Sequence, residues 1–151
     1  MIECLPNQQK CHIGFVSTRL EGTDGVSLET AKWAEVFEKM GFSCYYFAGE
    51  LDRPRRSSFL SEKAHFKHPE IRELFQTCFG TSKRHRRTTD IIYSIKQELK
   101  EDLYAFVRQF DIDLLVPENA LTIPLNIPLG IAITEVISET GMPTIAHHHD
   151  F

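Results

Sequence analysis

Three short polar stretches in this sequence combine residue types that could do chemistry. The first is the segment 19–27, which contains Gly22 and Gly25. Two glycines allow a tight turn, and a helix starting directly after them would offer free N–H groups and a positive dipole end to a phosphate. The segment matches neither the GxGxxG nor the GxxxxGK[ST] pattern. The same glycines could therefore serve only to turn the chain.

The second stretch is Pro117-Glu118-Asn119, with Asn126 a little further along. A carboxylate and an amide at the end of a strand can hydrogen-bond sugar hydroxyls or other neutral polar ligands. Inside an apolar strand the same groups would be costly to bury. Asn119 could equally be a local turn former.

The third stretch is His147-His148-His149-Asp150. In an extended segment, His147 and His149 share one face and His148 takes the other, so at most two imidazoles converge. A zinc site needs three or four ligands, and the sequence holds no second His/Cys cluster with ligand spacing, so no metal is predicted. We favour a His-Asp pair in which the Asp150 carboxylate orients or charges the imidazole of His149 for work at a substrate hydroxyl.

Short apolar runs that alternate with longer helical patterns predict the elements that hold these stretches. The alternation is typical of βαβ units, and it predicts an α/β fold with a three-layer, Rossmann-like parallel sheet flanked by helices. In such a sheet, ligands bind beyond the carboxyl ends of the strands. The predicted strands cover residues 12–18, 42–47, 112–116 and 143–147.

Apolar residues at helical spacing predict three long helices. The first begins near Ser27, which can cap it, and stops at Gly41. The second is capped by Thr88 or Thr89 and runs to residue 110, and the third covers 129–140. The period is lost over residues 48–87, where we expect a short helix at 59–66 and another that opens at Pro69. The packing face of the first helix is Val26, Thr30, Trp33, Phe37 and Met40.

Length and composition indicate one soluble domain. The chain has 151 residues, 42% of them hydrophobic and 25% charged, which excludes collagen-like and disordered classes. No apolar run reaches the roughly 18 residues that span a bilayer, and the first ten residues lack a leader pattern, so we expect a cytoplasmic protein. The cysteines form no CxxC pair, and we expect reduced thiols. They are Cys4, Cys11, Cys44 and Cys78.

Positive charge gathers in the middle third of the chain. The net charges of residues 1–50, 51–100 and 101–151 are -3, +6 and -7. The basic segment 83–87 could attract phosphates or another anionic partner, or it could be an ordinary solvated loop. The whole chain is acidic, and no known reader motif accompanies the basic segment, so nucleic-acid binding is not predicted.

Taken in order, segments 22–27, 117–121 and 144–151 resemble the amino-terminal domain of retaining, GT-B-type glycosyltransferases. This large group includes sucrose and sucrose-phosphate synthases and bacterial polysaccharide transferases, and the resemblance spans roughly residues 12–151. It implies two Rossmann-like domains that face each other across a cleft. The amino-terminal domain would receive the sugar or glycoside acceptor, and the carboxy-terminal domain would bind the nucleotide-sugar donor.

The resemblance also implies roles for individual residues, with no cofactor and no metal. Glu118 and Asn119 would lie on the acceptor side, and His149 with Asp150 would act near the transferred sugar as the catalytic pair. Transfer with retention would need no protein nucleophile, so positioning and electrostatics would dominate. The residues that would approach the donor diphosphate or the acceptor are Gly22, Thr23, Asp24 and Gly25.

The donor-binding domain of that family has no counterpart in the 151 residues. We therefore expect one acceptor-side domain over residues 1–151 that cannot turn over alone, and a chain end where a doubly wound domain would normally continue. An apolar cleft face left uncovered could drive homodimerisation. The alternative is a stand-alone α/β module that binds a ligand or partner, with the basic segment 83–87 on an anionic surface.

Overall fold

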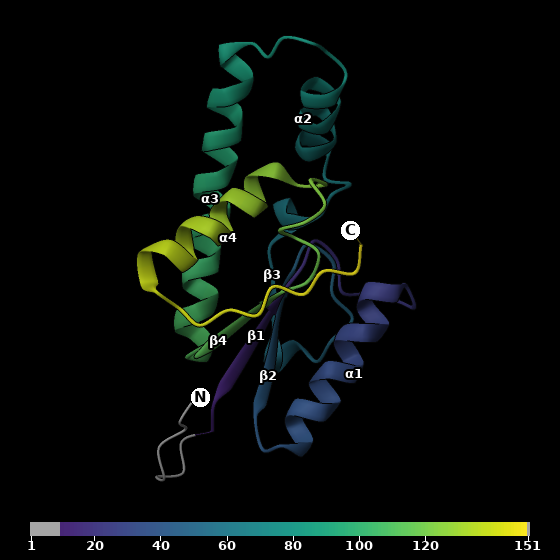
Figure 1. Ribbon diagram of the computed structural model, residues 1–151, viewed down its shortest axis with the longest axis vertical. Coiled ribbons are helices and arrows are strands. Elements are labelled where there is room, and N and C mark those ends of the chain that lie inside the picture. Colours follow the sequence, from purple (N-terminus) through teal and green to yellow (C-terminus); the bar gives the residue numbers. More distant parts are fainter. Residues whose placement is uncertain (1–9, 151) are drawn as a thin grey trace.

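A four-stranded parallel sheet forms the middle layer of the fold (Figure 1). The structure is a computed structural model that describes residues 10–150. The strand order is β3-β2-β1-β4, and every neighbouring pair is parallel. The predicted Rossmann-like α/β fold is confirmed. The strands are β1 (His12–Val16), β2 (Ser43–Ala48), β3 (Ser58–Leu60) and β4 (Leu114–Pro117).

Helices cover both faces of the sheet, with α1 on one side and α3 and α4 on the other (Figure 1). None of the helices described in residues 10–150 combines the length and the apolar character needed to cross a bilayer. The helices are α1 (Gly25–Lys39), α2 (Pro69–Phe79), α3 (Arg86–Phe110) and α4 (Ile127–Thr140), with 3-10 turns η1 (Arg55–Ser57) and η2 (Glu62–Ala64).

Two separate apolar cores lie between these layers. Along β1, Phe15 packs in the core toward α1, whereas the neighbouring Val16 packs in the core with α3 and α4. Successive side chains of a strand point to opposite faces, which is why a strand buried on both faces reads as a continuous apolar run. Gly14 allows α3 to approach closely, because a Cβ there would lie 2.8 Å from the Phe106 ring.

The start of α1 differs from the prediction. Asp24, not Ser27, is the N-cap, and its carboxylate accepts a hydrogen bond of 3.0 Å from the Ser27 amide. The helix therefore begins two residues earlier, and Ser27 is buried inside its first turn. The predicted packing face is correct except for Met40, which is 64% exposed. Gly41 follows the helix with a φ of +93°, as the stop signal predicted.

The long helix α3 also begins earlier than predicted. Its N-cap is His85, without a side-chain cap hydrogen bond, so neither Thr88 nor Thr89 caps it. Thr88 is instead buried within the first turn. The helical spacing that predicted this helix is confirmed, because its buried apolar residues recur every three or four positions. They are Ile92, Ile95, Leu99, Leu103 and Phe106.

Residues 48–87 contain one correct and one wrong prediction. Helix α2 opens at Pro69 as expected. The helix predicted over 59–66 is wrong, because Ser58–Leu60 pairs with β2 and only a short 3-10 turn follows. Phe59 stacks on Phe47 at a ring-centroid distance of 5.5 Å, so the apolar residues there serve a strand.

Two of the cysteines predicted to be reduced, Cys44 and Cys78, carry free thiols. Burial and the nearby charge of Glu38 raise the pKa of Cys44 to about 12, so this thiol is a core side chain rather than a nucleophile. Cys4 and most of the segment examined for a leader lie outside the described residues.

The carboxyl-terminal segment runs alongside β4, although it forms isolated bridges and not the strand predicted at 143–147. Thr144 bridges Leu115, and His147 bridges Glu118, both in parallel. The His147 amide donates to the Pro117 carbonyl at 3.0 Å, and the Asn119 amide donates to the His147 carbonyl at 2.9 Å. These bonds bring the histidine stretch to the carboxyl end of β4.

Candidate functional site

The candidate site lies at the topological switch point of the sheet, beside β1. Strand β1 pairs with β2 on one side and with β4 on the other, and the chain leaves these strands toward opposite faces of the sheet. In open α/β sheets the ligand crevice lies beyond the carboxyl ends of the strands at such a switch point. A cavity of about 210 Å³ occupies this place. Its lining includes Ser17, Arg19, Asp24, Glu118 and Asn119.

This cavity brings together two of the three stretches singled out in the sequence. Asp24 comes from the loop after β1, and Glu118 with Asn119 follows β4. Phe66 and Leu125 add apolar surface to the same lining. Polar groups on an otherwise apolar wall are typical of a small-molecule site.

The third stretch joins the site through the carboxylate of Glu118. This side chain is fully buried, and its Oε2 lies 2.7 Å from His149 Nε2 and 2.8 Å from His147 Nδ1. His147 and His149 therefore share one face, as the alternation predicted. His148 lies on the other face, where its Nδ1 contacts the Thr122 hydroxyl.

The predicted His-Asp pair is wrong in its partner, because the carboxylate that holds His149 is that of Glu118. The Asp150 carboxylate instead accepts a hydrogen bond from Asn119 Nδ2 at 3.2 Å. The Asn119 side chain in turn accepts from the His149 amide at 2.6 Å. Asn119 also has a φ of +57°, so it is a turn former that also lines the candidate cavity.

Helix α1 contacts the histidine stretch through Trp33. The Trp33 indole stacks on the His147 ring at 4.3 Å with an interplanar angle of 25°. The rings of His147 and His149 lie 4.3 Å apart. Sequence reasoning assigned Trp33 to the packing face of α1 and gave no signal for this second contact.

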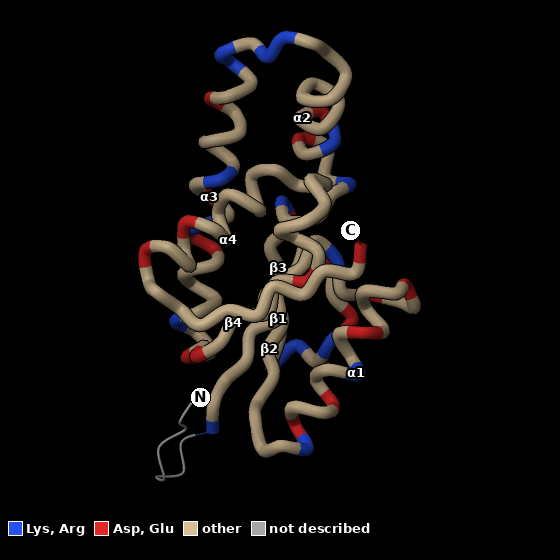
Figure 2. Tube along the Cα trace, in the orientation of Figure 1, with Lys and Arg blue, Asp and Glu red and all other residues tan. Residues whose placement is uncertain are grey.

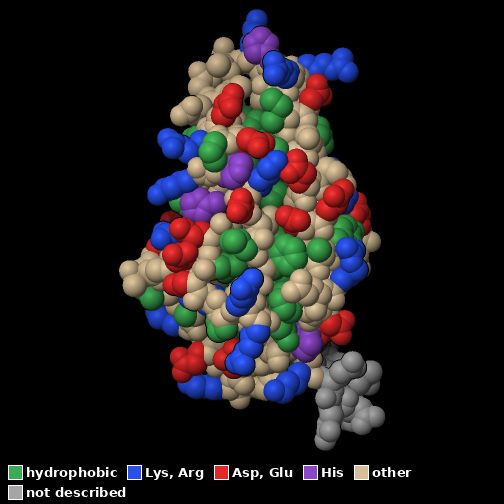
Figure 3. All heavy atoms as spheres, turned by 180° about the vertical axis from the view of Figure 1, so that it is seen from behind, with side chains coloured by type: hydrophobic (Ala, Val, Ile, Leu, Met, Phe, Trp, Pro, Cys, Tyr) green, Lys and Arg blue, Asp and Glu red, His purple; other side chains and the backbone are tan. Residues whose placement is uncertain are grey.

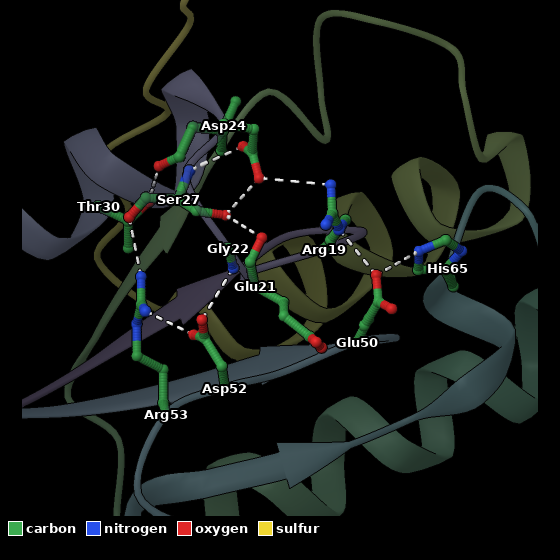
Figure 4. Close-up of polar contacts among 11 residues, drawn as sticks. Arg19, Glu21, Gly22, Asp24, Ser27, Thr30, Glu50, Asp52, Arg53 and His65 are labelled. Atoms are coloured by element: carbon green, nitrogen blue, oxygen red, sulfur yellow. Dashed lines mark hydrogen bonds and ion pairs between the residues drawn. The ribbon is translucent and has the colours of Figure 1, made fainter.

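The loop after β1 is held by a polar network that Figure 4 shows. The Gly22 amide, which a phosphate could have used, donates to Asp52 Oδ2 at 2.8 Å, and Gly22 has a φ of +80°. Arg19 Nε contacts Glu50 Oε2 at 2.7 Å, and its Nη1 lies 3.6 Å from Asp24. Thr23 and Gly25 are exposed beside this network. A substrate role for the four predicted loop residues stays a prediction.

The hydrogen bonds at the start of α1 also set the charge of Asp24. Burial raises the pKa of Asp24. Hydrogen bonds from the Ser27 amide and hydroxyl and the charge of Arg19 together lower this pKa by more than burial raises it, so the pKa is below its ordinary value. The carboxylate is therefore ionised where it caps the helix.

Asp24→Ala is expected to lower the free energy of unfolding by about 1 kcal/mol at pH 7, because it removes the N-cap. Since the folded pKa is lowered, the carboxylate contribution is present above the ordinary pKa and is lost as pH falls through the folded value. Urea unfolding at pH 7 and at about pH 3 should show the difference from wild type shrinking in acid. Asp24→Asn is the control, because asparagine also caps, and an equal loss in that variant would contradict the capping role.

Two predicted features lie elsewhere. Asn126 is buried and structural: its side chain accepts from the Leu129 amide at 3.0 Å and donates to the Lys63 and Ala64 carbonyls. The basic segment 83–87 is exposed and runs from the loop after α2 into the first two residues of α3. Figure 2 shows Lys and Arg positions along this tip of the trace, and Figure 3 shows Lys and Arg side chains there. The partner of this segment stays a prediction.

Comparisons with known proteins point to one activity class. No protein-family model matches the chain, and no solved structure matches it. A mannosylglucosylglycerate synthase of Petrotoga mobilis is 26% identical over 92% of this chain and 32% of its own length. The synthase of the same name from Thermotoga maritima is 28% identical over 85% of this chain and 29% of its own length. The chain thus spans about a third of the relatives that it matches, and the similarity supports a relationship with glycosyltransferases.

Proposed function

We propose that this chain is the acceptor-side domain of a retaining, GT-B-type glycosyltransferase that moves a sugar from a nucleotide-sugar donor to a sugar or glycoside acceptor. The observation that carries the proposal is the pair of alignments, which cover most of this chain and about a third of each synthase. A domain-sized match of this kind fits one domain of a larger enzyme.

The cavity at the end of β1 and β4 supports an acceptor role. Asn119 offers an amide beside the buried carboxylate of Glu118, and both line the cavity with Asp24. Carboxylate and amide groups of this kind hydrogen-bond sugar hydroxyls in several directions. In the proposal, Glu118 and Asn119 orient the acceptor, while the loop residues lie toward the donor diphosphate or the acceptor. Those loop residues are Gly22, Thr23, Asp24 and Gly25.

His149 is the residue that we place nearest the chemistry. Its Nε2 is held by the Glu118 carboxylate at 2.7 Å, which fixes the orientation of the ring. That leaves Nδ1 to bond a hydroxyl or an anionic oxygen of the substrate. Asp150 adds a second carboxylate nearby, held by Asn119. The chain would then contribute position and charge, and the donor would supply the leaving group.

The proposal is tested by expressing the chain with its natural downstream sequence beside the 151-residue form and assaying sugar transfer from a nucleotide-sugar. Turnover is expected only in the longer protein, because the donor-binding residues would lie outside the acceptor-side domain. Transfer by the 151-residue form would contradict the need for a second domain. No transfer in either form, across a panel of nucleotide-sugars and acceptors, would contradict the glycosyltransferase proposal itself.

A further inference from the structure

We propose that Glu118, His147 and His149 form a binding site for one divalent first-row metal ion, with zinc as the best fit. One ligand-type atom from each residue lies within 4.8 Å of the other two, namely Glu118 Oε2, His147 Nδ1 and His149 Nε2. Two imidazole nitrogens and one carboxylate oxygen are a donor set that zinc and its neighbours accept, with a further position left for water or a substrate oxygen. The site shares Glu118 and His149 with the proposed function, but its test is binding of the metal alone, which does not require sugar transfer.

The contact between His147 and Glu118 is short without being a hydrogen bond. His147 Nδ1 lies 2.8 Å from Glu118 Oε2, yet this buried nitrogen has no aligned hydrogen-bond partner within residues 10–150. His149 Nε2, by contrast, is hydrogen-bonded to the same oxygen at 2.7 Å. The in-plane bonding direction of the His147 nitrogen is therefore not satisfied by Glu118. A metal ion between the three groups would use that direction.

The charge of the cluster also calls for a cation. The Glu118 side chain is fully buried, and its Oε1 has no hydrogen-bond partner in the described part of the chain. A buried carboxylate is costly unless it is paired. The ion pairs of Glu118 within residues 10–150 are with His147 and His149, which are charged only when protonated. A divalent ion carries its charge at every pH, and it could also take Oε1 as a second oxygen ligand.

The surroundings hold the three groups in place and leave a route to them. Trp33 stacks on the His147 ring, and the Asn119 side chain holds the His149 amide. Contacts of this kind fix the orientation of metal ligands and raise affinity. The His147 and His149 side chains are 20% and 16% exposed, so an ion can approach the cluster from the side of the imidazoles.

His148 is a matched control within the same run of histidines. It is exposed and contacts Thr122 on the other face of the segment. If the folded cluster binds the metal, the affinity should not depend on His148. Adventitious binding to a histidine-rich segment should depend on all three histidines alike. The prediction that no metal binds rested on a search for a second His/Cys cluster, and the third ligand here is a carboxylate from the end of another strand.

The test is titration of the untagged, chelator-treated 151-residue chain with Zn²⁺ by calorimetry and with Co²⁺ by visible absorption. We expect one ion per chain and Co²⁺ ligand-field bands typical of nitrogen and oxygen ligands. His147→Ala, His149→Ala and Glu118→Gln should each weaken binding at least about 10-fold, because each removes a ligand. His148→Ala should bind like wild type.

Thermal unfolding followed by circular dichroism checks that each variant folds. Zn²⁺ should raise the Tm of wild type and of His148→Ala, because the ion binds only the folded chain, and should leave the Tm of folded ligand variants unchanged. The two histidine variants alter partly exposed side chains, so they keep the test valid if Glu118→Gln does not fold. Absence of binding in wild type, or an equal loss in His148→Ala and His147→Ala, would overturn the proposal.

Discussion

His149→Ala is expected to lower kcat for sugar transfer about 100-fold or more in the chain joined to its natural downstream sequence. The substitution removes an imidazole that Glu118 fixes from one side, so that its other nitrogen can face the substrate. Loss of a positioned proton-transfer or charge-stabilising group acts mainly on the transition state, so kcat should fall more than KM rises. Initial rates with a nucleotide-sugar and its acceptor measure both constants.

His148→Ala is the control for this substitution, because it removes an adjacent imidazole from the opposite face of the segment. It should keep nearly the wild-type kcat. Glu118→Gln should reproduce much of the His149→Ala loss, since a neutral amide makes a weaker hydrogen bond to the His149 ring than the carboxylate does and holds it less firmly. A kcat for His149→Ala close to that of wild type would show that His149 takes no part in the chemistry.

Phe106→Ala is expected to lower the free energy of unfolding by about 3–5 kcal/mol. The Phe106 ring is fully buried between the sheet and α3, with its centroid 5.6 Å from those of Phe47 and Phe110. Gly14 has no side chain that could fill the space left by the ring. The surrounding residues would therefore leave a cavity rather than close it. Urea unfolding followed by circular dichroism gives the free energy.

Phe79→Ala is the matched control, since it makes the same chemical change at a side chain that is 56% exposed at the end of α2. Its cost should be about 1 kcal/mol or less, because the ring loses only a partial contact with Phe75. Equal losses in the two variants would show that the packing between α3 and the sheet is not the main core of this domain.

Features that depend on local periodicity were predictable from the amino-acid pattern alone. Apolar runs and helical spacing located the sheet, most of the helices and the stop at Gly41, because burial of one or both faces of an element leaves a repeat in the chain. Strict alternation along an extended segment placed His147 and His149 on one face and His148 on the other. The polar stretches were recognised by their position just after the predicted strands, because ligands bind beyond the carboxyl ends of parallel strands.

Which of these groups are in contact depends on the tertiary structure. Glu118, and not the adjacent Asp150, holds His149, because the parallel pairing of the last segment with β4 places residues 118 and 147 side by side. The Asp150 carboxylate accepts a hydrogen bond from Asn119 instead. Residues 58–60 became a strand through pairing with β2, although their own pattern suggested a helix. In each case the outcome depends on a backbone hydrogen bond to a distant segment. Local spacing carries no record of such a partner.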